Sequence, residues 1–165
     1  MSSLLPNLKR LASPSTLKSV WSVLKSMPGG GVMMGRIIGQ LAPYTGTIRP
    51  EILALEPGLA RVRMNDSRRV RNHLNSVHAI ALMNLGEVAT GTAMLVSAPE
   101  GARAIIVHLG MDYLKKARGP ITAECTCAIP TSLERKEYDV TADLKNADGV
   151  VIARAHARWL VDAAP

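Results

Sequence analysis

The fold is decided by residues 76–97, SVHAIALMNLGEVATGTAMLVS, where one carboxylate, Glu87, stands in an otherwise apolar, helix-like run. The apolar residues recur with a helical rather than a strand-like period. Many positions hold small residues, namely Ala79, Ala81, Gly86, Ala89, Gly91 and Ala93. Small residues let a helix lie close to another backbone, and a helix that is apolar on most sides is usually buried. We therefore expect this helix at the centre of the fold.

Strand-like runs of alternating apolar and polar residues lie on both sides of this helix. Before it, two short runs separated by Pro57-Gly58 predict a hairpin. After it, no second long helix interrupts the pattern. The expected strands cover residues 47–56, 59–66, 102–114, 120–130, 136–145 and 149–161. These elements predict an α+β fold, in which an antiparallel sheet of about six strands wraps around one long central helix and keeps its other face in water.

Residues 1–42 precede this pattern, and we expect them to form a helical extension that packs on a core domain of residues 43–165. Two apolar stripes at helical spacing, one on each side of Gly29-Gly30-Gly31, indicate these helices. Their members are Leu17, Val20, Trp21 and Leu24, followed by Met33, Ile37, Ile38 and Leu41. The segment is also basic, rich in Ser and free of acids, as are organellar transit peptides and some membrane-surface helices. Those two interpretations stay open.

The composition bounds the chain to one domain and excludes some functions. A chain of 165 residues, 47% of them hydrophobic, can bury one core but not two. The absence of Phe, with two Trp and three Tyr, argues against nucleic acid, because single strands are held by stacked aromatic side chains. Part of the net charge of +7 comes from Lys9, Arg10, Lys18, Lys25 and Arg36, ahead of the first acid. We expect no nucleic-acid partner and, as the primary interpretation, no membrane contact.

The two cysteines, Cys125 and Cys127, predict a reducing environment. Their spacing in a strand-like run puts both side chains on one face, too close in sequence for an ordinary disulfide. They are typical of small core residues in a reducing compartment, so we expect a cytoplasmic protein. A zinc site would need more Cys or His at ligand spacing, so we expect no metal and no cofactor.

A sheet that is covered by a single long helix leaves edge strands with unpaired backbone groups. Pairing the edges of two copies is a simple symmetric way to satisfy those groups. We therefore expect self-association, as a homodimer or a homotetramer.

The spacing of Asn72, His78 and Glu87 resembles that of an Asn or Gln, a His and an Asp or Glu in the hotdog-fold acyl-CoA thioesterase superfamily. The similarity is strongest to its phenylacetate-degradation and 4-hydroxybenzoyl-CoA thioesterase-like branches. It covers roughly residues 44–162 and agrees with the order of the expected strands. The preceding residues look like extra N-terminal helices of an uncharacterised branch. The resemblance implies the hotdog fold and hydrolysis of a thioester.

The residues themselves constrain where each group lies. His78 and Glu87 would fall on opposite sides of one helix, so they do not form an adjacent pair, and His78 belongs at or before the helix start. The first backbone N–H groups, from about Ala79 or Ile80, lack intrahelical acceptors and carry the positive end of the helix dipole. An acid in an apolar run is solvated, paired or used, and a raised carboxyl pKa is one way of preparing a general base.

The resemblance gives these residues roles at a site between two subunits. It implies that Glu87 of one subunit activates water as a general base, or attacks the thioester as a nucleophile. The thioester carbonyl would lie at the helix start of the other subunit, with the Ala79 and Ile80 N–H groups as the oxyanion hole. Asn72 would orient the carbonyl or the water, and His78 would complete the catalytic set.

Two basic clusters and the residues after Glu87 complete the expected substrate site. The clusters would meet the phosphates of coenzyme A, which enters only as part of the substrate. They are Arg68, Arg69 and Arg71, and Lys115, Lys116 and Arg118. Thr90 and Gly91 follow the acid, and Gly91 stands where some relatives have a Thr or Ser that holds the water. Ala79 and Ile80 replace the Gly-Gly that usually follows the His.

The sequence thus predicts hydrolysis of an acyl-CoA-type thioester, and it leaves alternatives open. The chain could be a non-catalytic hotdog protein that binds acyl-CoA or lipid, or a membrane-surface protein that uses its basic N-terminal helices. Each site residue also has a structural interpretation. Glu87 could bond to a partner helix, His78 could serve only the helix start, Asn72 could be a loop former, and the basic clusters could be solvated.

Overall fold

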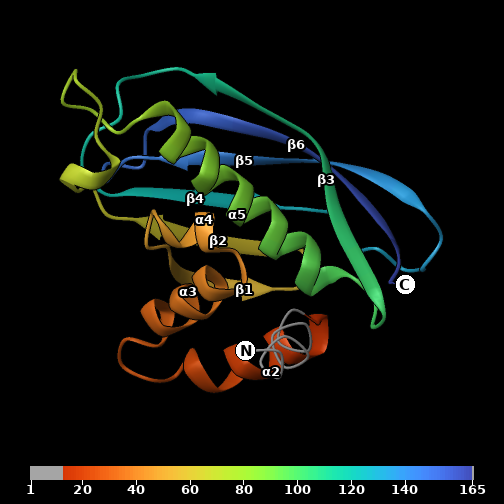
Figure 1. Cartoon of the computed structure of the whole chain (residues 1–165). Coiled ribbons are helices and arrows are strands. Elements are labelled where there is room, and N and C mark those ends of the chain that lie inside the picture. The colour runs from red at the N-terminus through yellow and green to blue at the C-terminus, as the bar shows by residue number, and fades with distance from the viewer. Residues whose placement is uncertain (1–12, 165) are drawn as a thin grey trace.

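Helix α5 (Ala79–Ser97) lies in the concave face of a single sheet that curves around it (Figure 1). The structure, a computed structural model, describes residues 13–164. It confirms the expected central helix, which begins at Ala79 because His78 is an N-cap with extended backbone. By length and composition α5 could cross a membrane, but 67% of its most apolar window is buried inside the fold, as in the core helix of a globular domain.

The strands form a six-stranded sheet in the order β1-β2-β4-β5-β6-β3, and all neighbours are antiparallel. Their bounds are Glu51–Glu56 (β1), Leu59–Met64 (β2), Ala102–Tyr113 (β3), Ile121–Thr126 (β4), Lys136–Lys145 (β5) and Val151–Ala163 (β6). The predicted α+β architecture is confirmed. β1 begins later than expected, because the helical turn α4 (Pro43–Gly46) and the hydrogen-bonded turn that follows it occupy residues 43–49.

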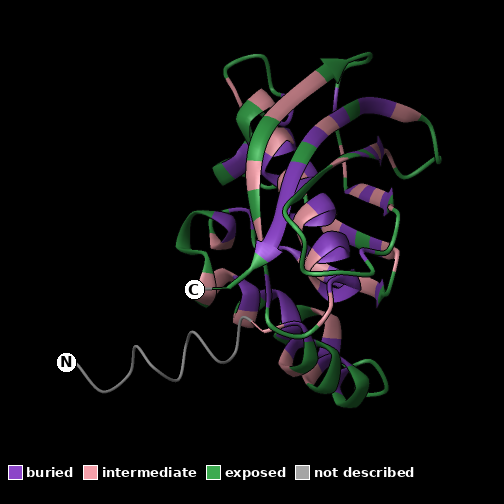
Figure 2. Ribbon diagram, turned by 90° about the vertical axis from the view of Figure 1, so that its right-hand side faces the viewer, coloured by how far each residue is buried: buried purple, intermediate pink, exposed green. Residues whose placement is uncertain are grey.

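The hydrophobic core lies between α5 and the sheet, where Figure 2 shows buried residues on both facing surfaces. Alternate residues of the strands point inward, and many are small. Examples that are completely buried are Ala123, Ala142 and Ala155. Because these side chains are short, α5 comes so close that a Cβ at Gly86 would lie 2.5 Å from the Cβ of Ala155.

Two N-terminal helices, α2 (Pro14–Leu24) and α3 (Gly30–Leu41), cover β1 at one edge of the sheet (Figure 1). In the predicted stripe of α2, Leu17, Trp21 and Leu24 are buried, and Val20 is partly buried. In α3 the buried stripe runs through Met34 and Ile38, and Met33, which we expected in it, is 47% exposed. Residues 1–12 of the expected extension, with Lys9 and Arg10, lie outside the described residues.

Helix α3 packs on β1 through a face that is made of glycines. A Cβ at Gly31 would lie 2.2 Å from the carbonyl oxygen of Ile52, and a Cβ at Gly35 would lie 1.7 Å from that of Pro50. The helix backbone therefore touches the strand backbone, and this contact rotates Met33 outward. As a result β1 is shielded, whereas within residues 13–164 the opposite edge strand, β3, pairs only with β6.

Replacing Gly35 by Ala should destabilise the protein. Ala favours a helix over Gly by up to ~1 kcal/mol, but a methyl group overlapping a backbone oxygen costs about 1–3 kcal/mol or more, so the clash outweighs the gain. We expect a lower thermal unfolding temperature by differential scanning fluorimetry. Gln40→Ala, at an exposed position of the same helix, should leave it nearly unchanged. Equal unfolding temperatures for both variants would contradict this contact.

Candidate active site

The loop before α5 fixes the start of the helix. The backbone N–H of Val77 donates to the carbonyl of Ala117 at 2.9 Å, and that of His78 donates to Val70 at 2.7 Å. His78 is the N-cap, and its Nδ1 accepts a hydrogen bond from the N–H of Ile80 at 3.1 Å. The predicted place of His78 at the helix start is confirmed, and its side chain serves the helix.

This cap changes which backbone groups are free at the helix start. The N–H groups of Ala81 and Leu82 donate to the carbonyl of His78, and that of Ile80 is taken by the imidazole. The N–H of Ala79 has no acceptor within residues 13–164. Of the two expected oxyanion donors, Ala79 is therefore available, whereas Ile80 becomes available only if the imidazole of His78 turns away.

Asn72 shapes the loop that leads to the helix. Its Oδ1 accepts hydrogen bonds from the N–H of Leu74 at 3.0 Å, and from the N–H and hydroxyl of Ser76 at 3.2 and 3.1 Å. The next turn includes Asn75 in the left-handed region with φ 52°. The side-chain oxygen of Asn72 is thus committed to the loop, and only its Nδ2 is left to meet a ligand.

Glu87 lies on the stripe of α5 that the fold leaves partly open. Its residues recur every three or four positions, and each is exposed or half-exposed. They are Ile80, Met83, Glu87, Gly91 and Leu95, which we call the open stripe. One side of the first half of α5 is covered by α4, where the Nδ2 of Asn84 donates to the carbonyl of Tyr44 at 3.0 Å. At the helix start, on the β3 side, Tyr113 donates its hydroxyl proton to the carbonyl of Ala79 at 3.1 Å.

The surroundings of Glu87 favour its neutral form. Partial burial among apolar groups raises the pKa of the carboxyl above its ordinary value of 4.5, and no hydrogen bond or opposite charge within residues 13–164 offsets this effect. Glu87 therefore has the electrostatic character of a general base, and it lacks the intrachain partner that a structural acid would have.

The two residues expected to follow the acid in the site behave differently. Thr90 is completely buried, and its hydroxyl donates to the carbonyls of Gly86 and Glu87, both at 3.0 Å. These contacts place Thr90 in the packing of the helix, so it does not reach a substrate in this structure. Gly91 lies on the open stripe, where a Cβ would be 2.9 Å from Cζ2 and Cη2 of Trp159 and 3.8 Å from Oε1 of Glu87.

Trp159 was not among the site residues predicted from the sequence. The alternation along β6 puts its side chain on the inner face with that of Ala157, and this signal was available. The contact between Trp159 and Gly91 could not be predicted from the sequence, because this contact depends on how α5 packs on the sheet.

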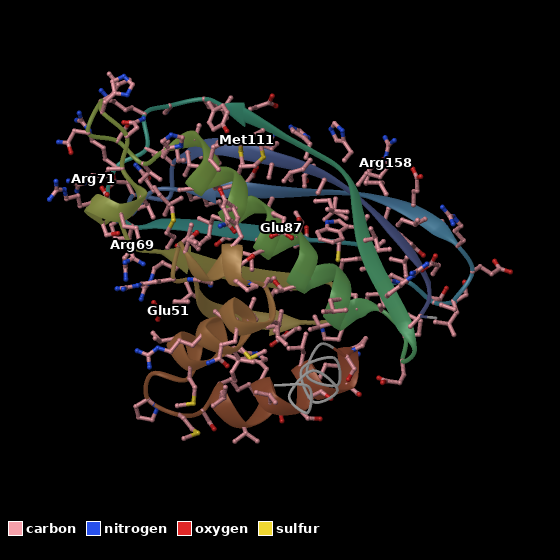
Figure 3. The ribbon with its side chains drawn as sticks, in the orientation of Figure 1. Glu51, Arg69, Arg71, Glu87, Met111 and Arg158 are labelled. Atoms are coloured by element: carbon pink, nitrogen blue, oxygen red, sulfur yellow. The ribbon has the colours of Figure 1, made fainter. Side chains whose placement is uncertain are left out.

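The two basic clusters, far apart in the sequence, lie at the same end of the molecule. The Val77–Ala117 hydrogen bond joins the segments that carry them, and all six side chains are exposed. Figure 3 shows Arg69 and Arg71 near the start of α5, with Glu87 further along the helix. Arg71 already donates to Asp66 at 2.6 Å and lowers the pKa of that carboxyl. Arg71 is thus partly committed. Within residues 13–164, Arg68, Arg69, Lys115, Lys116 and Arg118 have no ion pair.

A pocket of about 330 Å³ lies between α4, the 3-10 helix η1 (Arg68–Val70) and the start of α5. Its lining combines basic and apolar side chains, including Tyr44, Ile48, Arg69, Arg71, His78 and Ile80. Tyr44 and Ile48 were not predicted as site residues, because the sequence pattern did not indicate α4 as a separate element.

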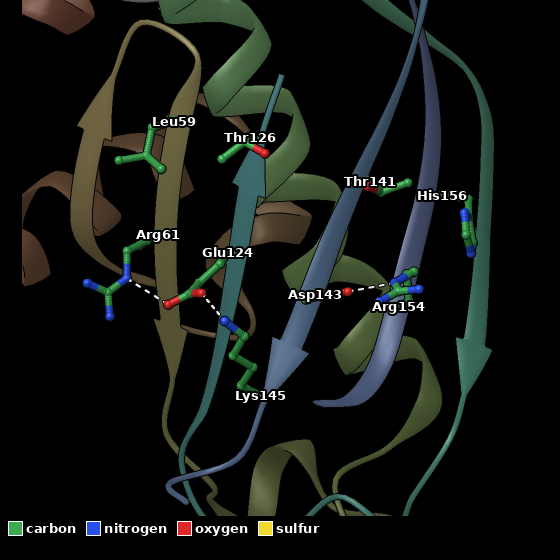
Figure 4. A pocket seen from close by; sticks show the side chains of 9 residues that line it. All are labelled: Leu59, Arg61, Glu124, Thr126, Thr141, Asp143, Lys145, Arg154 and His156. Atoms are coloured by element: carbon green, nitrogen blue, oxygen red, sulfur yellow. Dashed lines mark hydrogen bonds and ion pairs between the residues drawn. The ribbon is translucent and has the colours of Figure 1, made fainter. Parts of the chain in front are cut away.

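A broader hollow of about 600 Å³ lies on the outer face of the sheet (Figure 4). Its cationic side chains are each paired with a carboxylate. Arg61 meets Glu124 at 3.0 Å, Arg154 meets Asp143 at 2.6 Å, and Lys145 also bonds to Glu124. With its charges satisfied by one another, this face offers a ligand fewer free groups than the end of the molecule at the start of α5.

Within residues 13–164 no three His, Cys, Asp or Glu side chains gather as metal ligands would. Cys125 is buried in β4 and Cys127 is half-buried just after it, and both are free thiols.

The architecture matches known structures along most of the chain. A structural-genomics protein, APC5556, is 30% identical with a TM-score of 0.76, over 90% of this chain and 98% of its own length. A probable thioesterase from Pseudomonas aeruginosa is 23% identical with a TM-score of 0.72, over 84% and 97%. A thioesterase from Haemophilus influenzae is 18% identical with a TM-score of 0.65, over 78% and 90%.

A comparison with curated proteins found no significant match. Residues 30–161 match the family described as Domain of unknown function (DUF4442). The neighbours in the structural comparison confirm the fold that the sequence resemblance implied. The chain therefore has the hotdog fold and belongs to the DUF4442 family.

Proposed function

We propose that this protein hydrolyses acyl-CoA-type thioesters at a site shared by two copies of the chain. The observation that carries the proposal is Glu87, a carboxyl with a raised pKa on the open stripe and without a partner in residues 13–164. Leaving an acid in such a place is costly, which favours a use for it over a purely structural role. The fold shared with proteins named as thioesterases supports the reaction class.

The chemistry follows from two groups. As a carboxylate, Glu87 removes a proton from water that attacks the thioester carbon, or attacks that carbon itself and forms an anhydride that water then opens. Either route places negative charge on the carbonyl oxygen before the thiolate leaves. The N–H of Ala79, at the positive end of the α5 dipole, is the donor for that oxygen. Asn72 would orient the carbonyl through Nδ2, and His78 positions the helix start.

Two copies are needed because Glu87 is too far from its own helix start. It lies more than two turns into α5, about 12 Å along the axis from Ala79. A second chain brings another helix start within reach. The edge strand β3 is the natural contact, since β1 is covered and β3 exposes Ile105 (43%) and Val107 (48%) beside its unpaired backbone. A homodimer, or a homotetramer of such dimers, would bury this edge together with the open stripe.

The basic end of the molecule would hold the coenzyme A portion of the substrate. Arg68, Arg69, Lys115, Lys116 and Arg118 are exposed around the start of α5, where the thioester carbonyl would lie. Phosphates favour this end because Arg and Lys form charge-assisted hydrogen bonds with them. The free thiols of Cys125 and Cys127 fit a reducing compartment, and we place the protein in the cytoplasm.

A second candidate function is binding of acyl-CoA or lipid without cleavage. Two observations favour it. The side chain of Ile80 is 49% exposed at the helix start, where the resembled families have a Gly that lets the thioester approach. Gly91 offers no hydroxyl to hold a water. Saturable binding of acyl-CoAs without release of free thiol would identify this function.

Replacing Glu87 by Gln should stabilise the protein at pH 7. Burial raises the folded-state pKa, so the folded protein binds a proton more tightly than the unfolded chain. Stability is then lost as pH rises from the unfolded-state pKa, near 4.5, through the folded-state pKa. Gln removes this loss, so the gain in unfolding temperature should be largest at neutral pH and disappear at about pH 3. Glu56→Gln, at an exposed acid, serves as control. A less stable Glu87→Gln protein at pH 7 would contradict the raised pKa.

The same variant should lose hydrolysis. A positioned general base contributes ~10²- to 10⁴-fold to the rate, so Glu87→Gln should lower kcat by that factor. The measurement is free-thiol release from a panel of acyl-CoAs, with binding followed in parallel by calorimetry. Glu56→Gln should retain full activity. A wild-type protein that releases thiol at the same rate as Glu87→Gln would refute the role of Glu87.

The variant Ala79→Pro tests whether the N–H of Ala79 is the oxyanion donor. Proline removes the N–H yet suits the first position of a helix, and His78 already has the extended backbone, φ −67° and ψ 140°, that a residue before proline prefers. The variant should fold normally and lose ~10²- to 10³-fold in kcat. Ala79→Ser keeps the N–H and is the matched control. Equal activity of the two variants would exclude the Ala79 N–H as donor.

Mixed dimers test whether the site is shared. Glu87→Gln and Ala79→Pro chains, unfolded and refolded together in equal amounts, would form heterodimers in which one of the two sites has both groups intact. Activity should return to about a quarter of the wild-type level, as random pairing predicts. If both groups act within one chain, no activity returns.

A further inference from the structure

The indole of Trp159 is a neighbour of Glu87 that the proposed reaction does not use. The ring belongs to β6, is 6% exposed, and lies against Gly91 on α5. The Cβ position of Gly91 is 2.9 Å from its Cζ2 and Cη2 atoms and 3.8 Å from Oε1 of Glu87. The carboxyl group and one edge of the indole therefore meet at the backbone of Gly91.

The indole also carries an unpaired N–H next to this edge. Within residues 13–164, Nε1 of Trp159 is the one buried side-chain nitrogen or oxygen without a hydrogen-bond partner. Cζ2 is bonded to Cε2, the ring carbon that carries Nε1, so the N–H is adjacent to the edge that lies against Gly91. A buried N–H without an acceptor costs stability, and a Phe would fill most of this space without that cost. The presence of Trp at this position therefore suggests that a hydrogen-bond acceptor for its N–H is supplied in the functional state.

The packing on either side of Glu87 limits where an acyl group could lie. No channel for an acyl chain runs between α5 and the sheet at Gly86. A single methyl group on Gly86 would lie 2.5 Å from Cβ of Ala155 and 3.2 Å from Cε of Met111. Towards the end of α5 the indole closes the space beside Gly91. An acyl chain next to Glu87 is thus confined to the open stripe and reaches Trp159.

The cross-strand neighbours of Trp159 are not fully enclosed. Trp159 pairs across the sheet with Ile106 of β3 and Tyr138 of β5, and both are only partly buried. We expect a ligand on the open stripe to gain access to the N–H by rotation of such partly buried side chains, without movement of the backbone.

We propose that Trp159 is the specificity-determining residue of the Glu87 site. Its ring ends the acyl pocket, and its N–H donates to an oxygen of the acyl group beyond the thioester carbonyl. The inference rests on the proposed function and names its substrate class, which is short acyl groups that carry a hydroxyl or carbonyl oxygen. A site built to hydrogen-bond such an oxygen discriminates against the analogue without it, because its buried N–H is then left unpaired.

Three variants separate the ring from its N–H. Trp159→Phe keeps an aromatic wall and removes the N–H, and Trp159→Leu shortens the wall. Trp21→Phe alters the other tryptophan, which is buried in a different element, α2. The substrates are 3-hydroxybutyryl-CoA, butyryl-CoA and octanoyl-CoA, each compared by kcat/KM from thiol release. The wild type should prefer the hydroxylated chain over butyryl and both over octanoyl.

The two substitutions at Trp159 should change different ratios. Trp159→Phe should lose about 3- to 10-fold of the preference for 3-hydroxybutyryl over butyryl and still reject octanoyl. Trp159→Leu should reduce the discrimination against octanoyl ~10-fold or more. Trp21→Phe should leave both ratios unchanged. Should Trp159→Leu fail to fold, Trp159→Met supplies the shorter wall.

Several outcomes would overturn this role while leaving the hydrolase intact. They are a wild type without preference for the hydroxylated chain, unchanged ratios in both Trp159 variants, or an equal fall in kcat/KM for all three substrates, which indicates a merely structural residue. A wild type that cleaves no acyl-CoA refutes the proposed function instead. In that case the same ratios, taken from dissociation constants of the three acyl-CoAs, decide whether Trp159 selects the ligand.

Discussion

The contact between Gly86 and Ala155, where a methyl group on the glycine would come within 2.5 Å of the alanine, sets how closely α5 lies on the sheet. Interiors are close-packed, so this distance fixes the rest of the core. Larger residues at either position would lift the helix and leave space around Met94 and Leu144, which are now completely buried. The small residues of α5 and the alanines of the inner sheet face are thus both required for the short distance between the helix and the sheet.

The same closeness decides what the fold leaves open. The sheet wraps α5 and the N-terminal helices cover its other flank. After Ala79 at the helix start, only the open stripe therefore remains partly exposed along the helix. The glycine face of α3 shields β1 by direct contact with its backbone, so the sheet has one open edge, β3, within the described residues. Stripe and edge together form a surface suited to a second copy, and Glu87 stands on it.

Much of the fold could be predicted from the sequence because local patterns encode it. The small-residue helix, the six alternating runs and the turn at Pro57-Gly58 each follow from the period of apolar residues or from turn chemistry. The errors were at the start of β1 and on the buried face of α3. The stretch at 47–50 carries strand-like residues, yet helix α4 and its turn pre-empt it, and Met33 faces water because glycines, not apolar residues, face β1.

The site was predictable only in part. Spacing placed Glu87 in the central helix and His78 at its start, since both positions follow from where a helix begins. It could not show that His78 caps the N–H of Ile80, that Thr90 turns its hydroxyl back to the helix, or that Asn72 is bound into its loop. Such hydrogen bonds depend on side-chain rotamers and on the exact turn, which residue types alone do not fix.

The sequence by itself determined the class of fold and the isolation of one carboxylate in an apolar helix, because periodicity and composition are local properties. Only the tertiary structure decided that this carboxylate has no partner within the described chain, that two distant basic clusters meet at the start of α5, and that Trp159 lies against Gly91. These facts depend on how the strands are ordered and how the helix is seated on them, and that packing joins residues whose separation in the chain carries no signal of their contact.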